Sequence, residues 1–152
     1  MPSFTFVATA NAVLYCGGRP VFADIFGLEN PSIDPAEVER LITRRTRAVT
    51  AVHFAGYPAA VDQLAELCRD RGLALIEDAA HAPSAHLGGR KLGTFGLASA
   101  FSFFSNKVLP VGEGGLRCWQ PMTTNSRPAY AAALTRHDEH DVGSASRSRR
   151  QL

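Results

Sequence analysis

Apolar and polar positions alternate in two different rhythms along the first 119 residues. Short, nearly continuous apolar runs predict buried β-strands, because strands covered on both faces lack the strict alternation of half-exposed ones. Longer stretches with apolar residues three and four positions apart predict amphipathic helices. Strands are expected at residues 4–9, 20–24, 48–54, 73–76 and 98–103, with an extended segment at 111–116 and a hairpin-like excursion at 87–95.

Two helices have clear end signals. Asp34-Pro35 predicts an N-cap followed by a proline at the first helical position, and Val38, Leu41 and Ile42 give that helix one apolar face. The second helix is expected over residues 61–71 and ends at a glycine, the usual residue after a helix C-terminus. Residues 9–15 are compatible with the start of a further helix.

This order of strands and helices predicts an α/β fold with a mostly parallel sheet flanked by helices. Ligands in such sheets bind beyond the carboxyl ends of the strands. Asp78 follows the strand at 73–76 and Lys107 follows the strand at 98–103, so both are expected near that edge. Residues 120–152 are polar, rich in arginine and without usable periodicity. We therefore expect one domain over residues 1–119 and an irregular tail over residues 120–152.

Composition and charge exclude several classes of protein. The 152 residues are 45% hydrophobic and 20% charged, which is typical of a soluble globular chain. The net charge of +2 and the lack of a basic stripe argue against nucleic-acid binding, and no apolar run is long enough to cross a membrane. Cys16, Cys68 and Cys118 are odd in number and widely spaced, which indicates free thiols in the cytoplasm and predicts no metal site.

Asp78 and Lys107 are the residues with the clearest candidate chemistry. An aspartate that ends an apolar strand needs a cationic partner, and a protonated pyridine nitrogen is one; the alternative is an N-cap for the residues that follow. Lys107, one of only two lysines, lies among aromatic and aliphatic neighbours that favour a neutral, nucleophilic amine. A surface lysine on a loop is the alternative, and Ser102 beside it fits either a phosphate contact or a turn.

Four stretches carry a resemblance to a known family. They are residues 2–12, residues 20–24, Ile76-Glu77-Asp78-Ala79-Ala80-His81-Ala82, and Phe101-Ser102-Phe103-Phe104-Ser105-Asn106-Lys107 followed by Gly112-Glu113-Gly114-Gly115. At this spacing the sequence resembles the DegT-type sugar aminotransferases of the fold-type I enzymes, which depend on pyridoxal 5'-phosphate (PLP). The resemblance covers nearly all of residues 2–117 and implies part of the large domain of such an enzyme.

The resemblance implies a role for each of five residues. Lys107 would bind PLP as a Schiff base and then carry protons between cofactor and substrate, and Asp78 would pair with the pyridinium nitrogen. His81 lies where the family usually has a glutamine near the phenolic oxygen of the cofactor. Phe6 would stack on the pyridine face, and Ser102 would contact the phosphate. The resemblance gives no role to His53 or His86, which we expect to be structural.

The implied reaction is transamination in two steps. Glutamate or glutamine gives its amino group to the cofactor, and a ketone on a nucleotide-linked sugar or a cyclitol then accepts it. The alternative is a truncated, non-catalytic remnant of such an enzyme. A related sugar dehydratase is disfavoured because histidine replaces the lysine in those proteins. A dinucleotide-binding domain is disfavoured because no Gly-x-Gly-x-x-Gly motif follows a strand in this sequence.

The family's enzymes are longer than this chain, so we expect a fragment truncated at both ends. An upstream turn that grips the phosphate and a downstream small domain would be missing, and the full-length family is expected to form homodimers. Reading the tail from Pro128 with a one-nucleotide shift yields a Trp-Asp-Arg-His-Arg-Gly-His stretch similar to the family's continuation. A frameshift is therefore one explanation of the tail.

Overall fold

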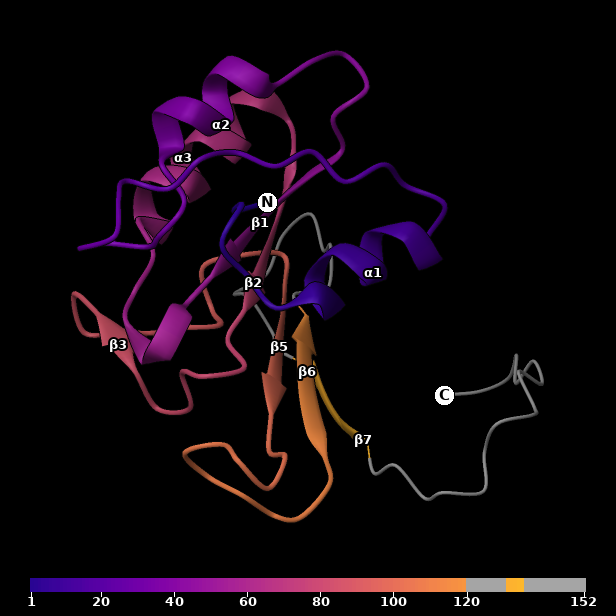
Figure 1. Ribbon diagram of the computed structural model, residues 1–152, viewed down its shortest axis with the longest axis vertical. Coiled ribbons are helices and arrows are strands. Elements are labelled where there is room, and N and C mark those ends of the chain that lie inside the picture. The colour runs from indigo at the N-terminus through magenta and orange to yellow at the C-terminus, as the bar shows by residue number, and fades with distance from the viewer. Residues whose placement is uncertain (120–130, 136–152) are drawn as a thin grey trace.

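The computed structural model describes residues 1–119 and 131–135 (Figure 1). Its central sheet has the strand order β1-β2-β5-β6-β7. Parallel pairing joins β1, β2 and β5, whereas β5, β6 and β7 pair antiparallel. The strands are β1 (Ala48–Val52), β2 (Ala74–Asp78), β5 (Ala98–Ser102), β6 (Gly115–Trp119) and β7 (Ala131–Thr135).

The helices are α1 (Val7–Tyr15), α2 (Pro35–Leu41) and α3 (Val61–Arg71), and a short 3-10 turn, η1 (Phe54–Gly56), follows β1. Helix α3 connects β1 to β2 and contacts both strands as well as α2. Figure 1 shows α2 and α3 together and α1 apart from them. The expected α/β architecture of parallel strands with flanking helices is therefore confirmed. The expected excursion at 87–95 overlaps a small hairpin of β3 (His86–Leu87) and β4 (Arg90–Lys91).

Both predicted helix signals are confirmed. The Asp34 side chain accepts a hydrogen bond from the Ala36 backbone N–H at 2.8 Å, and Pro35 occupies the first turn of α2. Helix α3 ends at Gly72, whose φ of 63° is the left-handed conformation that glycine adopts without a steric penalty. Local capping chemistry thus fixes the ends of the two helices that lie against the parallel strands.

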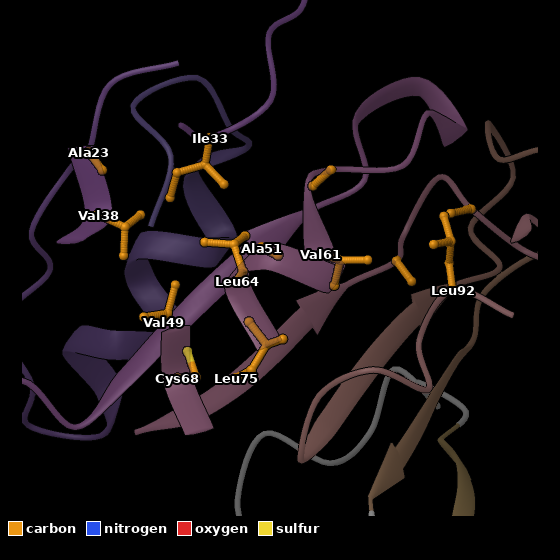
Figure 2. Close-up of a cluster of buried hydrophobic side chains, with 13 residues drawn as sticks. Ala23, Ile33, Val38, Val49, Ala51, Val61, Leu64, Cys68, Leu75 and Leu92 are labelled. Atoms are coloured by element: carbon orange, nitrogen blue, oxygen red, sulfur yellow. The ribbon is translucent and has the colours of Figure 1, made fainter. Parts of the chain in front are cut away.

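The core lies between these helices and the parallel strands. Leu64 and Cys68 of α3 pack with Val49 of β1 and Leu75 of β2, and Val38 of α2 joins the same cluster (Figure 2). Inward and outward positions alternate along β2, since Leu75 is buried and Ile76 is 37% exposed. The continuous apolar run therefore packs α3 on one face, and its other face is less covered within the described residues.

Two expected strands are wrong. The run at 4–9 is not a strand, because α1 begins at Val7 and the Thr9 N–H closes onto the Phe6 carbonyl at 3.1 Å. Aromatic and β-branched residues favour strands only where a strand partner exists, and tertiary contacts override that preference here. The run at 20–24 contributes only an isolated bridge between Pro2 and Ala23, although Ala23 is buried.

The C-terminal region also differs in part from expectation. Residues 131–135 were expected to be irregular, but they form β7 and pair with β6 from Gly115↔Thr135 to Trp119↔Ala131. The pairing depends on backbone hydrogen bonds, which need no periodic side-chain pattern, so the strand could not be predicted from periodicity. The remaining tail positions, 120–130 and 136–152, and the frameshift hypothesis that concerns them, lie outside the described residues.

Several large apolar side chains are exposed on the described residues. They lie in the N-terminal segment and around the loop after β5: Phe6, Val7, Tyr15, Phe22, Phe26, Leu28, Val108 and Val111. No helix in the part of the chain that the structure describes is long and apolar enough to span a membrane. Such exposure predicts low stability of the isolated chain.

Candidate active site

The carboxyl ends of the parallel strands bring the candidate residues to one edge of the sheet. Val52 at the end of β1 is paired with Asp78 at the end of β2, and Asp78 is paired with Ala100 of β5. Ser102 ends β5, and the loop after it leads to Lys107. The parallel pairing thus explains why residues far apart in the sequence meet here.

Asp78 is held by hydrogen bonds on both carboxylate oxygens. Its Oδ2 accepts from the Thr9 hydroxyl of α1 at 2.8 Å, and its Oδ1 accepts from the Ala80 backbone N–H at 3.2 Å. Thr9 is buried and its Oγ1 lies 3.1 Å from Thr5 Oγ1, so the tether to α1 is itself supported. The bond to Ala80 resembles the N-cap contact of the alternative interpretation of Asp78, although a turn and not a helix follows; the bond to Thr9 is not local.

Lys107 and His81 are in direct contact. Lys107 Nζ lies 3.0 Å from His81 Nε2, and the Lys107 backbone N–H donates to the Phe104 carbonyl at 2.9 Å, which closes a turn. The other ring nitrogen of His81, Nδ1, accepts from the Ala55 backbone N–H at 3.3 Å. The described structure therefore links Lys107 through His81 to the turn η1.

The turn η1 is packed closely against His81. The Phe54 ring meets the imidazole in an edge-to-face arrangement with centroids 5.8 Å apart, and Phe4 also packs against Phe54, with centroids 4.8 Å apart. A Cβ at Gly56 would lie 3.1 Å from the His81 carbonyl oxygen, and Gly56 has a φ of 85°. Only a glycine fits this close approach with that backbone conformation.

Phe6 and Ser102 make fewer contacts. Phe6 is the residue before α1 and is 74% exposed, whereas the aromatic ring that packs on His81 belongs to Phe54. Ser102 Oγ accepts from the Phe104 backbone N–H at 3.4 Å, within the loop that leads to Lys107. Asp78, His81 and Lys107 are therefore tied into the described contacts more firmly than Phe6 and Ser102.

A second polar cluster lies buried behind the site. His53 Nε2 lies 3.1 Å from Glu77 Oε2, and both side chains are fully buried. The Glu77 carboxylate also accepts from the backbone N–H groups of Gly93 at 2.7 Å and of Phe95 and Gly96 at 2.6 Å each. Burial acts to raise the pKa of Glu77, but the hydrogen bonds from His53, Gly96 and Gly93 outweigh it, and the pKa is lowered.

This cluster is a structural element of the sheet edge. His53 Nδ1 accepts from the Ala59 backbone N–H at 3.2 Å, so the proton of the neutral ring lies on Nε2 and points to Glu77. The His53 backbone N–H donates to the Asp78 carbonyl at 3.0 Å. The pair joins β1, β2 and the turn at 93–96, and so fixes the backbone on which Asp78 sits.

Three contributors to this edge were not predicted from the sequence: Thr9, Ala55 and Glu77. The spacing of Thr5 and Thr9, one helical turn apart in an apolar run, is a weak signal for a buried hydroxyl pair. Ala55 acts through its backbone and leaves no residue-specific signal. Within the described residues, no group of three or more His, Cys, Asp or Glu side chains could hold a metal ion.

Residues 1–137 match the DegT/DnrJ/EryC1/StrS aminotransferase family. GDP-perosamine synthase of Vibrio cholerae is 46% identical over 116 residues, which are 76% of this chain and 31% of that protein. The dTDP-4-dehydro-2,3,6-trideoxy-D-glucose 4-aminotransferase of Saccharopolyspora spinosa is 44% identical over 117 residues, 76% of this chain and 30% of that protein.

A solved structure agrees with the sequence matches. DesI, crystallised in the presence of its TDP-sugar product, superposes with a TM-score of 0.71 at 44% sequence identity and covers 76% of this chain and 29% of that one. The chain thus spans about 30% of the length of the relatives that it matches.

Proposed function

The chain belongs to the DegT/DnrJ/EryC1/StrS aminotransferase family, and from this membership we propose that residues 1–119 supply the PLP-binding part of a sugar aminotransferase. The expected family and fold class are thereby confirmed; the activity of the chain is the proposal. The observation that carries it is the contact of 3.0 Å between Lys107 Nζ and His81 Nε2 beside the tethered carboxylate of Asp78.

The residues at the sheet edge fit PLP chemically. Lys107 would hold PLP through the aldehyde carbon of the cofactor, whose oxygen leaves as water, and the ring would supply an electron sink for bond breaking at the substrate carbon. A carboxylate has about four lone-pair sites. Thr9 and Ala80 occupy two of those on Asp78, so sites remain for a pyridine N–H. Tethering by α1 would hold that carboxylate in place and reduce the entropy lost when it pairs.

The remaining residues have roles that follow from their chemistry. Lys107 Nζ would hold the cofactor and move a proton at the substrate carbon once the amine is released. His81 would donate from Nε2 to the phenolic oxygen. The exposed ring of Phe6 would stack on the pyridine face, and Ser102, whose Oγ accepts from Phe104, retains its hydroxyl hydrogen for a phosphate oxygen. The His53–Glu77 pair would act only by fixing the strand ends.

The proposed substrate is the ketone of a nucleotide-linked sugar or of a cyclitol, and the proposed amino donor is glutamate or glutamine. The names of the relatives support the first part, because they specify a GDP-linked and a dTDP-linked sugar. The whole protein would act as a homodimer with small-molecule substrates. The chain spans about 30% of those relatives, so the identity of the sugar is part of the proposal only as a class.

The chain has only two lysines, Lys91 and Lys107, which makes the test direct. The purified chain is mixed with PLP, its visible absorbance is recorded, and borohydride is added to fix any attached PLP for peptide mass spectrometry. We expect an absorbance band and a mass increase on the Lys107 peptide, which Lys91→Ala keeps and Lys107→Ala loses.

Glutamate then separates the active enzyme from a non-catalytic remnant. Loss of the band on addition of glutamate supports amino-group transfer by this chain. A band on Lys107 that glutamate leaves unchanged supports a remnant that binds PLP without turnover. PLP attachment that is equal at both lysines, or absent, would contradict the proposed cofactor site.

A further inference from the structure

The hydrogen bonds of His81 determine where its ring proton lies. The Ala55 backbone N–H donates to Nδ1 at 3.3 Å, and a peptide N–H cannot act as an acceptor. Nδ1 must therefore carry a lone pair, which excludes both the imidazolium and the tautomer with its proton on Nδ1. The one proton of a neutral imidazole then lies on Nε2, the nitrogen that is 3.0 Å from Lys107 Nζ.

We infer that the backbone N–H of Ala55 fixes His81 as the Nε2–H tautomer, and that His81 thereby presents a donor to Lys107 and selects its free amine. An ammonium group has three donors and no acceptor, so it cannot receive this bond. A free amine has one lone pair and can. His81 is a positioning residue in this arrangement, and Ala55 positions His81.

Asp78 is the other charged residue close to His81 in the sequence, and it makes no described hydrogen bond to the His81 ring. The carboxylate of Asp78 is engaged by Thr9 on one oxygen and by Ala80 N–H on the other. Among the described contacts, Lys107 is thus the titratable group that bonds to the His81 ring directly. The hydrocarbon ring of Phe54 packs against the His81 ring edge-to-face. The Ala55 N–H therefore determines that His81 is the donor and Lys107 the acceptor in the bond between them.

The backbone at Ala55 is built to keep this N–H in place. Ala55 has a φ of 52° and a ψ of 20°, a left-handed conformation that is uncommon for a residue with a side chain. Such conformations persist only where the surroundings hold them, and they cluster at functional sites. Here the Gly56 and Tyr57 N–H groups donate to the carbonyls of His53 and Phe54, which closes the turn on both sides of Ala55.

The inference deepens the proposed function, since Lys107 is the proposed point of attachment of PLP, but its test uses the full chain without PLP. Histidine ring nitrogens are labelled with ¹⁵N, and two-bond correlations to the ring protons report which nitrogen is protonated. The His81 signals are assigned by their loss in His81→Gln. We expect an unprotonated Nδ1 and a protonated Nε2 near neutral pH; a protonated Nδ1 would overturn the inference.

Competitive labelling measures the amine itself. A limiting amount of an amine-acylating reagent is added, and the ratio of label on Lys107 to label on exposed Lys91 is read by mass spectrometry. Near pH 7, we expect His81→Leu to lower this ratio by about fivefold, the effect of one hydrogen bond of ordinary net strength on an equilibrium. His81→Gln should keep the ratio, because its amide offers both an acceptor to Ala55 and a donor to Lys107.

Two comparisons guard against a purely structural effect. The matched control, His86→Leu at an exposed histidine of β3, should leave the ratio unchanged. At about pH 11, where ordinary lysine amines are free, all variants should give the same ratio. A fall that is equal at both pH values, or a fall of the same size in a folded His81→Gln, would overturn the inference. Either result leaves PLP attachment to Lys107, and hence the proposed function, to be judged by its own experiment.

Discussion

Replacing Glu77 by glutamine should be among the most destabilising single-atom changes in the described chain. Glu77 Oε1 accepts from the N–H groups of Phe95 and Gly96, and Oε2 accepts from His53 and Gly93. A glutamine amide has one oxygen, so in either orientation its NH₂ group faces two donors.

The cluster has no simple way to adapt to this change. His53 cannot move its proton to the far nitrogen, because His53 Nδ1 already accepts from the Ala59 N–H. Two buried donors therefore lose their acceptor, at a cost of about 1–3 kcal/mol each. Because two donors are affected, we expect the free energy of unfolding to fall by roughly 2–6 kcal/mol.

The matched control is Glu39→Gln on the surface. Glu39 forms an ion pair with Arg71, and the two side chains are 55% and 46% exposed. Exposed pairs of this kind contribute about 0–1 kcal/mol, so the same chemical change should be nearly silent there. Urea unfolding of the full chain, followed by circular dichroism, compares the two variants at equal m-value. Equal losses of less than about 1 kcal/mol for both would refute the reasoning about the buried cluster.

Acid provides a second readout of the same carboxylate. Burial acts to raise the pKa of Glu77, but the bonds from His53, Gly96 and Gly93 outweigh it, so the pKa in the folded chain is below its ordinary value of about 4.5. A lowered folded pKa means that the ionised form stabilises the fold above the unfolded pKa, and that this contribution is lost as pH falls through the folded pKa. The acid loss of stability should therefore be shallower in Glu77→Gln than in the parent chain. An unchanged acid profile would contradict the assignment.

The other predictions concern α1 and the core. Thr9→Val keeps the side-chain shape but removes the donor to Asp78, so unfolding free energy should fall by roughly 1–3 kcal/mol, as for a hydrogen bond to a charged group; an unchanged urea midpoint would show that the tether contributes nothing. Burial raises the pKa of the Cys68 thiol to about 11, so its thiolate fraction at neutral pH should be roughly a hundredfold below that of an ordinary thiol. Iodoacetamide should then label exposed Cys16 first and Cys68 only on unfolding, and equal labelling rates in the folded chain would contradict the buried position.

The parts of the fold that could be predicted from the sequence are those with local causes. Asp34 with Pro35 starts α2, and Gly72 ends α3, because caps act within a few residues. The run at 4–9 has a local residue pattern typical of a strand, but Thr9 lies in a helix and donates a hydrogen bond to Asp78, 69 residues away. Such a partner is not visible in a window of ten residues.

The candidate site divides in the same way. Asp78, His81 and Lys107 could be proposed from the sequence because their residue types and spacing resemble a family motif, and the structure brings His81 and Lys107 together. Ala55 could not be found, because it contributes a peptide N–H that every residue except proline has. Glu77 adjoins Asp78 in the sequence but points to the opposite face of β2, where it is fully buried. Alternation along a strand gave two neighbouring carboxylates different partners.

The segment from His53 to Ala59 serves two imidazoles at once. Ala55 and Ala59 each direct a backbone N–H to an Nδ1 atom, one on His81 and one on His53. Surface connections usually tolerate a change in length. Here one inserted or deleted residue would put at least one of these N–H groups out of register with its ring. The length of this connection should therefore be as constrained as the identity of the two histidines that it contacts. Single-residue deletions along 53–59 should be harmful even at positions where substitution is tolerated.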